Sequence, residues 1–246
     1  MKTLYKTTKI ELLRMFRNKY FVVFSIIMPF AFYAIYTSSI GGSTTIEGTE
    51  WKAYFLISMT CFSLMSSSVT TMGIQLLHDR LQPWMKWLQS LPIKRWEYFM
   101  ARFLSLMVLN GLIIVLLFAV AANWKNIELS LLSWVKVGAW VWGAIIPFLA
   151  LGTWVSVFKT TETAAGFANL TTLGLALMGG LWMPINQMPS LMQVIGEWTP
   201  GHLYAQGAWT LLAGEHISLA TIGLLILYFV LFLSGSLLTH RYLQKE

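Results

Sequence analysis

Residues that could do acid–base or metal chemistry are few and widely separated in this 246-residue chain. The histidines follow no ligand spacing, and the HExxH and GxSxG patterns of zinc proteases and serine hydrolases are absent. They are His78, His202, His216 and His240. Glu197 and Glu215 share a segment with two of these histidines, which leaves a metal or substrate contact open, although a solvated loop is the simpler explanation. We expect no enzymatic activity, no catalytic residue and no metal site.

Nucleotide and thiol chemistry are equally unsupported. No GxxxxGK[ST] phosphate loop occurs in the sequence, so any ATP-driven step needs a separate polypeptide. The single cysteine, Cys61, lies in an apolar stretch and has no partner for an intrachain disulfide. We therefore expect no cofactor in this chain.

Composition indicates a membrane protein. Hydrophobic residues make up 57% of the chain and charged residues only 11%, which is too apolar for a soluble domain. The formal net charge is +7, but the basic residues flank apolar stretches instead of forming one patch. They suit anionic lipid head groups, and we expect no nucleic-acid partner.

Six stretches are long enough to cross a bilayer and contain no Asp, Glu, Lys or Arg. They cover residues 20–40, 53–77, 103–122, 137–158, 164–182 and 217–239. The sequence therefore predicts an all-α integral membrane protein with six transmembrane helices in a single domain, residues 1–246.

Basic residues orient these spans, because Lys and Arg in short loops stay on the cytoplasmic side. With the N-terminus inside, 14 of the 17 Lys and Arg residues are cytoplasmic, and only Lys52, Lys125 and Lys136 are outside. We expect an N-in/C-in topology, with both termini cytoplasmic, in a bacterial-type plasma membrane.

Two segments are more than connections. Residues 1–19 place Leu4, Ile10, Leu13 and Phe16 among basic residues, which is typical of an amphipathic helix in the cytoplasmic interface, although a simple charged flank explains them equally well. Residues 183–216 contain three prolines and an apolar i, i+3, i+4, i+7 pattern, which predicts a short amphipathic helix in a re-entrant outer segment. That pattern is Leu191, Val194, Ile195 and Trp198.

Residues 78–102 form an island of charge between spans two and three. After Pro83, the apolar residues Trp84, Trp87, Leu88 and Leu91 share one face of a short helix that Pro92 would end. From these residues alone, an anchor in the lipid head groups and a docking helix for a cytoplasmic partner both stay open.

Two motifs resemble those of the ABC-2 type transporter permeases. In the island, Asp79, Arg80, Leu88 and Pro92 match the family pattern, whereas Pro83 replaces a common Gly and Ala101-Arg102 replaces Gly-Lys. Before the last span a second motif of Gly, three prolines and Tyr is matched. It consists of Gly180, Pro184, Pro189, Pro200 and Tyr204. The resemblance covers essentially the whole chain.

The resemblance implies a permease subunit of an ATP-driven exporter. Two cytoplasmic ATPase subunits, which bind ATP and Mg, would work with two permease subunits, either a homodimer or a related heterodimer. The island would carry a coupling helix, beside an interface helix with Arg14 and Arg17. The implied ATPase-coupling residues are Asp79, Arg80, Trp84, Lys86, Trp87, Leu88 and Pro92.

Spans one, two and five resemble the dimer-lining spans of that family, and we expect them to line the transport path. Small polar residues there either line the pathway or let helices pack closely. They are Ser63, Ser67, Thr70, Asn169 and Thr172. An uncharged, aromatic-rich path suits an amphiphilic or drug-like substrate, with polysaccharide as the alternative. An ion-coupled secondary transporter, with helices broken at Pro29 and Pro147, is the alternative from a different class.

Overall fold

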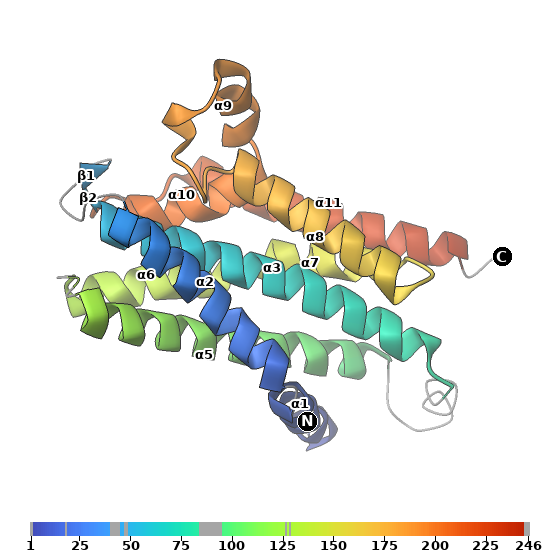
Figure 1. Cartoon of the computed structure of the whole chain (residues 1–246). Helices are drawn as coiled ribbons and strands as arrows, with labels where there is room; N and C mark the ends of the chain where they lie inside the picture. The colour runs from blue at the N-terminus through green and yellow to red at the C-terminus, as the bar shows by residue number, and fades with distance from the viewer. Residues whose placement is uncertain are drawn as a thin grey trace.

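The computed structural model describes residues 2–17, 19–39, 45–46, 49–83, 95–125, 127 and 129–243. The described chain is almost entirely helical, and its long helices form one bundle with roughly parallel axes (Figure 1). The helices are α1 (Lys2–Arg17), α2 (Lys19–Ser39), α3 (Trp51–Leu81), α5 (Arg95–Lys125), α6 (Leu131–Gly143), α7 (Ile146–Val155), α8 (Thr161–Met178), η1 (Ile185–Gln187), α9 (Ser190–Glu197), α10 (Pro200–Leu212) and α11 (Leu219–Leu243). A short antiparallel pair, β1 (Thr45–Ile46) and β2 (Thr49–Glu50), joins α2 to α3.

Each predicted span coincides with a helix, but not every helix is a clear membrane span. Within the described residues four helical stretches are long and apolar enough to cross a membrane: Trp51–Leu81, Trp96–Trp124, Leu131–Val155 and Leu219–His240. In α2 only Ile27–Ser38 appears as a shorter apolar helix, and α8 is not among the candidates. The helical membrane architecture is confirmed, and the six-span count stays a prediction.

Several predicted boundaries were wrong. The fourth span, predicted as 137–158, is divided into α6 and α7 by a turn at Ala144–Ile145, where Pro147 starts the second helix. Predicted span five, residues 164–182, ends early at Met178 because Gly180 has a φ of 80° and turns the chain. Helix α3 extends to Leu81, and α5 begins at Arg95, so the island is shorter than residues 78–102.

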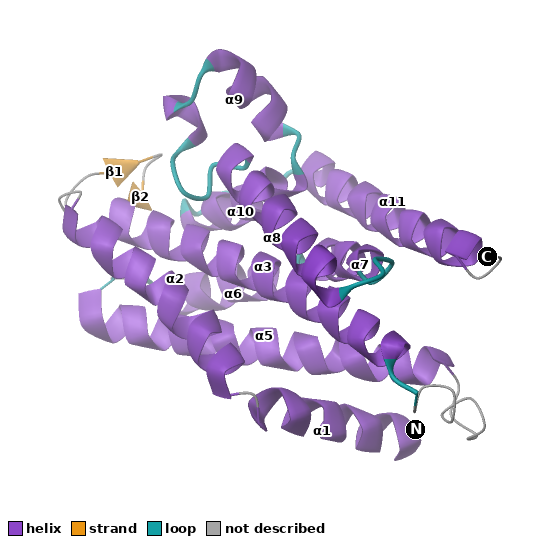
Figure 2. Cartoon of the chain, turned by 45° about the vertical axis from the view of Figure 1, so that its right-hand side comes forward, coloured by secondary structure: helices purple, strands orange, loops and turns teal. Residues whose placement is uncertain are grey.

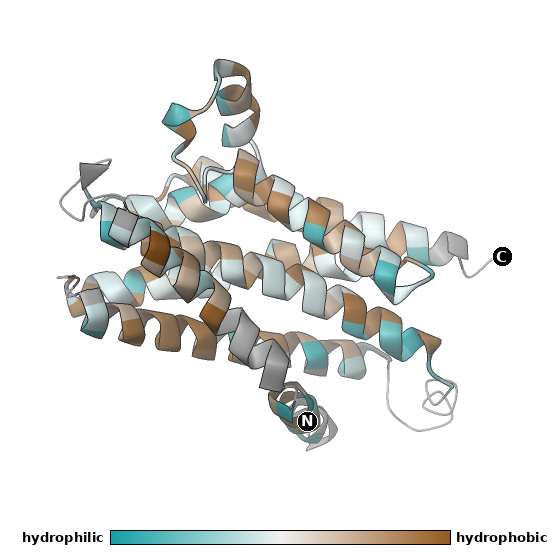
Figure 3. Ribbon diagram, in the orientation of Figure 1, coloured by the Kyte–Doolittle hydropathy of each residue, from teal (hydrophilic) through white to brown (hydrophobic). Residues whose placement is uncertain are grey.

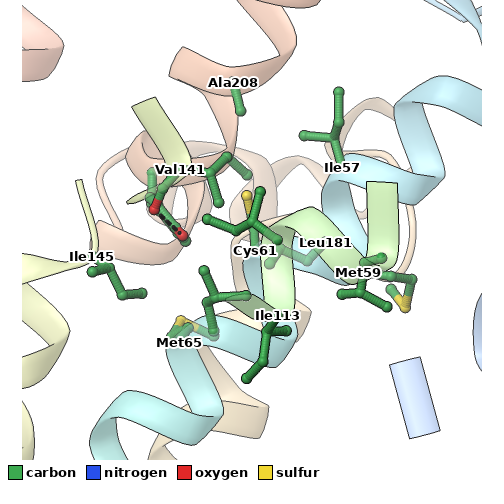
Figure 4. Packing of buried hydrophobic residues seen from close by; sticks show 14 of the residues in the cluster. Ile57, Met59, Cys61, Met65, Ile113, Val141, Ile145, Leu181 and Ala208 are labelled. Carbon is green, nitrogen blue, oxygen red and sulfur yellow. Dashed lines mark hydrogen bonds between the residues drawn. The ribbon is translucent and has the colours of Figure 1, made fainter. Parts of the chain in front are cut away.

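Helix α3 lies at the centre of the bundle. It packs on α2, α5, α7, α8 and α10, so most of its surface is buried by this chain. Cys61 and its neighbours Leu64 and Met65 have no exposed surface, and Figure 4 shows Cys61 among apolar side chains from several helices. Helix α11 covers the other side of α7, and α1 lies beside α5 (Figure 2).

The two termini lie toward the same end of the bundle in Figure 2. Polar residues colour the adjacent ends of α3 and α5, whereas apolar residues dominate the other half of α5 and most of α3 is pale (Figure 3). This arrangement fits the predicted topology, in which both termini share one membrane side.

Two glycines allow α3 and α7 to approach closely. A Cβ atom at Gly73 would lie 2.7 Å from the Val155 Cβ, and one at Gly152 would lie 2.9 Å from the Val69 carbonyl oxygen. Those separations are too short for real carbon contacts, so a larger residue forces the helices apart.

The Gly152→Ala substitution should lower the free energy of unfolding by about 1–3 kcal/mol, because its methyl group meets rigid backbone. Gly174→Ala on α8 is the matched control, since nothing lies within 4 Å of its Cβ position. The control should be neutral or more stable by up to about 1 kcal/mol through helix propensity. Thermal unfolding of the detergent-purified protein checks both, and equal effects would contradict the close approach.

Candidate functional site

A cluster of charged side chains lies at one end of the bundle, where the island begins. Asp79 on α3 and Arg102 on α5 have no exposed surface, and Arg102 Nη2 lies 2.7 Å from Asp79 Oδ2. Arg14 of α1 donates a hydrogen bond of 3.1 Å to the other oxygen, Asp79 Oδ1. One carboxylate of α3 therefore binds one guanidinium from each of two other helices.

Glu11 and Tyr98 complete this cluster. Arg102 Nη2 donates to Glu11 Oε2 at 2.8 Å and to the Tyr98 hydroxyl at 2.9 Å, while Tyr98 donates to Asp79 Oδ2. Glu11 is only 5% exposed, and the Arg102 guanidinium also lies 5.4 Å from the centre of the Tyr98 ring. We call Glu11, Arg14, Asp79, Tyr98 and Arg102 the charge cluster.

The charge cluster balances its formal charges, with two carboxylates facing two guanidiniums. Burial opposes the charged form of Arg14, but the neighbouring Asp79 and Glu11 outweigh it and raise the pKa of Arg14. A buried charge without an opposite charge beside it would lower the stability of the fold, so the charged members depend on one another. The cluster therefore fastens α1 to the end of α3 and the start of α5.

Arg80 has partners outside the charge cluster, whereas the His78 Nδ1 atom lies 3.7 Å from Asp79 Oδ1. Arg80 Nη2 donates to the carbonyl oxygens of Val157 and Phe158, which follow the end of α7. These carbonyls lie just beyond the C-terminal end of α7, where a cation is favourable. Gln82, one turn beyond His78, shares a hydrogen bond of 3.3 Å with its ring. Arg80 thus ties the end of α3 to the end of α7.

The structure places only part of the predicted coupling site. Arg14 contacts Asp79, whereas Arg80 contacts the carbonyl groups after α7 and Arg17 is exposed on α1. The other predicted coupling residues lie outside the described residues; they are Trp84, Lys86, Trp87, Leu88 and Pro92. Their roles stay predictions.

The predicted helix of residues 1–19 is confirmed as α1, and its position in the cytoplasmic interface stays a prediction. Ile10, Leu13 and Phe16 are 43–64% exposed, while Leu4 turns toward the bundle with the buried residues Glu11 and Met15. The outer face therefore mixes apolar and basic residues, as a helix in a lipid interface does.

Sequence reasoning missed three members of the charge cluster: Glu11, Tyr98 and Arg102. The sequence could have indicated a role for Glu11, because it is the only acidic residue among positions 1–19. Arg102 was noted only as a replacement in a family motif. Its partner Glu11 lies 91 positions away in the chain.

The Gly-Pro motif shapes the outer segment. Pro184 and Pro189 precede η1 and α9, and Pro200 is the first residue of α10, where its missing N–H costs nothing. Tyr204 is fully buried and donates a hydrogen bond of 2.8 Å to the Val141 carbonyl of α6. Gly180 supplies the turn after α8.

Helix α9 forms as predicted, and it projects from the bundle in Figure 1. Its apolar residues are exposed, with Leu191 at 71% and Trp198 at 62%. The helix is therefore amphipathic, but its apolar face is not covered by the described part of this chain. A re-entrant position in the membrane stays a prediction.

The predicted pathway residues divide into two groups. Ser63, Ser67 and Thr70 follow one line on α3, and the Ser67 and Thr70 hydroxyls are buried without a hydrogen-bond partner among the described residues. Thr172 is buried and bonds its own helix at Ala168, whereas Asn169 is exposed. The buried position and local hydrogen bond of Thr172 favour a role in helix packing. On α3, the hydroxyl groups of Ser67 and Thr70 are the ones left without a hydrogen-bond partner among the described residues.

Aromatic rings lie near this line. The Trp182 ring, just after α8, stacks on Phe32 of α2 at 5.7 Å and meets the edge of Phe62 of α3 at 5.5 Å. Three of the helices that flank the predicted pathway therefore meet through aromatic contacts.

Arg102→Met should lower the free energy of unfolding by about 3–5 kcal/mol, because it leaves two buried carboxylates with one guanidinium. Adding Asp79→Asn should recover part of this loss, since the remaining Glu11 and Arg14 balance each other. Thermal unfolding in detergent measures both, with exposed Arg17→Met as the control. Strictly additive losses would contradict the charge cluster.

Comparisons with known proteins agree with this architecture. Residues 43–238 match the family described as ABC-2 family transporter protein. The chain is also similar to "Putative transport permease YvfS" of Bacillus subtilis (strain 168), with 37% identity over 246 residues that cover 100% of this chain and 98% of that protein. Both matches extend over most of the bundle, including α3, α5 and the outer segment. The chain therefore belongs to the ABC-2 family of membrane transport permeases.

Proposed function

We propose that this chain is the permease subunit of an ATP-driven exporter in a bacterial-type plasma membrane. Family membership implies association with an ATP-binding cassette ATPase, which supplies ATP and Mg. The observation that carries the proposal is the charge cluster, which joins α1 to α3 and α5, the two helices between which the island lies in the chain. The island is the connection through which a cytoplasmic subunit acts on the spans.

The contacts of α3 support a mechanism for this action. A push on the island moves the end of α3, and with it α1 and α5, because the charge cluster holds the three together. Arg80 extends the connection to the end of α7, on which α11 packs. Since packed helices shift as rigid bodies, we propose that the spans tilt between inward-open and outward-open states.

A second permease subunit, identical or related, completes the pathway in this proposal. Helix α3 is enclosed mainly by its own chain, and α8 exposes Phe167, Leu170 and Leu177 away from it. The unsatisfied hydroxyls of Ser67 and Thr70 are the candidate polar contacts for substrate. Uncharged walls with aromatic rings favour an amphiphilic or drug-like molecule, and a polysaccharide that stacks on the rings is the alternative.

The ion-coupled alternative has one observation in its favour, the break between α6 and α7 at Pro147. The helices also contain buried charges, Asp79 and Arg102, that the predicted spans lacked. These charges neutralise each other within the cluster, however, so they favour a structural role over an ion-binding one. We therefore favour the ATP-driven proposal.

The first test is to extract the tagged chain from its native cell in mild detergent and identify the proteins that copurify stoichiometrically. A soluble subunit with a phosphate loop and ATP hydrolysis is the expected result. Recovery of the chain alone, active in liposomes with only an ion gradient, would overturn the proposal in favour of the secondary transporter.

Truncating the docking residues tests the coupling role. Trp84→Ala with Trp87→Ala should abolish transport-linked ATP hydrolysis, because buried aromatics dominate protein docking, while leaving unfolding temperature unchanged. Trp96→Ala is the control, since Trp96 is a 56% exposed tryptophan at the start of α5. Full coupling in the double variant would show that the island is only a lipid anchor.

Topology can be tested with single cysteines, because Cys61 is the sole native thiol and is buried. In a Cys61→Ala background, Met192→Cys on α9 should react with a membrane-impermeant maleimide in intact cells. Lys159→Cys, between α7 and α8, should react only after the membrane is opened. The reverse pattern would refute the N-in/C-in orientation.

A further inference from the structure

A cleft runs along the side of the bundle between α6, the start of α7 and α11. Its apolar part encloses about 630 Å³ and is lined almost entirely by carbon atoms. Ala139, Gly143 and Pro147 lie on one wall, and Ile222 and Phe229 lie on the other. We call this part the α6–α11 groove.

The groove continues into a second cavity of about 520 Å³. Ala139 and Trp140 line both cavities, so the two meet at these residues. The second cavity adds the polar side chains of Lys136 on α6 and of Glu215 and His216, which follow α10. We call it the Lys136 pocket.

The break in the fourth span explains why the groove exists. Helix α11 packs closely along α7, whereas the turn at Ala144–Ile145 directs α6 away from it. Helix α10 packs on both α6 and α11 and keeps them apart. The groove is therefore a product of the helix arrangement and not of a single missing side chain.

Trp140, at the junction of the two cavities, is held in place by α10. Its Nε1–H donates a hydrogen bond of 2.9 Å to the Tyr204 carbonyl. The ring also lies directly over Gly207, where a Cβ atom would come within 2.4 Å of the indole. The ring is thus a fixed wall of a preformed site.

The depth of the two cavities matches that of a lipid. Lys136 and Gly143, both on α6, are seven positions apart, which corresponds to roughly 10 Å along the helix, or about a third of the hydrocarbon thickness of a bilayer. In the proposed topology Lys136 lies toward the outer side of the membrane and the apolar groove lies deeper. An amphiphile standing along the membrane normal places its head and tail at these two levels.

The charges in the Lys136 pocket select the head group. Among the described residues neither Lys136 nor Glu215 forms an ion pair, although both line the same pocket. An ammonium and a carboxylate that line one cavity complement a phosphate and an amine in one molecule. A zwitterionic head group fits both, whereas an apolar protein segment would leave them unpaired.

We propose that this cleft binds a membrane glycerophospholipid that carries an amine in its head group. One acyl chain lies in the α6–α11 groove, the phosphate contacts Lys136 and the amine contacts Glu215. The site lies on the outside of the bundle, away from the Ser67 and Thr70 line on α3. It depends neither on the direction of transport nor on the ATPase.

The acyl-chain contact is tested with Gly143→Phe, which places a ring in the groove. Nothing lies within 4 Å of the Gly143 Cβ position, so the substitution leaves the helix packing intact. Gly223→Phe on α11 is the matched control, because its Cβ position is equally open but Gly223 does not line the cleft. Unfolding temperatures of both variants establish that they are folded.

Native mass spectrometry of the full chain, purified in mild detergent, measures bound lipid. The wild type and Gly223→Phe should retain one adduct of phospholipid mass, and its occupancy should fall roughly tenfold or more in Gly143→Phe, because at least two methylenes lose their burial. An unchanged adduct in Gly143→Phe, or none in the wild type, would overturn the proposal. So would an adduct that is a peptide or a second copy of the chain.

The head group is tested by reconstitution with deuterated phosphatidylethanolamine or phosphatidylglycerol. Lys136→Glu should reduce retention of both lipids, because both contain the phosphate. Glu215→Gln should reduce retention of phosphatidylethanolamine alone, since only that lipid carries the amine. Equal retention of both lipids by the wild type, unaltered by Glu215→Gln, would refute the assigned amine contact.

Discussion

The pairing of Asp79 with Arg102 is the contact on which the arrangement of α1, α3 and α5 depends. Neither side chain reaches water, so each would be unstable without the other. Arg14 and Glu11 then bring α1 to the same point, and Tyr98 fills the remaining hydrogen-bonding positions around Asp79. The three helices cannot separate at this end without exposing or isolating a charge.

This constraint determines how movement spreads through the bundle. Near Gly73 and Gly152, α3 and α7 are in backbone contact, and α11 packs on the other side of α7. Displacement of the α3 end is therefore carried to helices far from the charge cluster. The outer segment is held separately, by the hydrogen bonds of Tyr204 and Trp140 between α6 and α10. Ion pairs thus hold the helices together at the end with the charge cluster, and hydrogen bonds of aromatic side chains hold them at the other end.

Much of the fold could be predicted because it follows from local chemistry. Charge-free stretches predicted the apolar helices, and the prolines of the outer segment bounded the short helix that became α9. The charge cluster could not be predicted, because Glu11 and Arg102 meet only through tertiary packing of distant segments. Leu4 shows the same limit: its helical position was predictable, but the identity of the buried face depended on where α5 lies.

The central position of α3 has a consequence for how the protein is made. It is the least apolar of the four candidate spans and the one most enclosed by its neighbours. A segment with so many hydroxyl groups partitions weakly into lipid by itself. Its insertion during synthesis should therefore be completed only when α5 and α7 emerge and replace lipid around it. The last step of membrane integration would then be a folding step, in which the later helices replace lipid as the surroundings of α3.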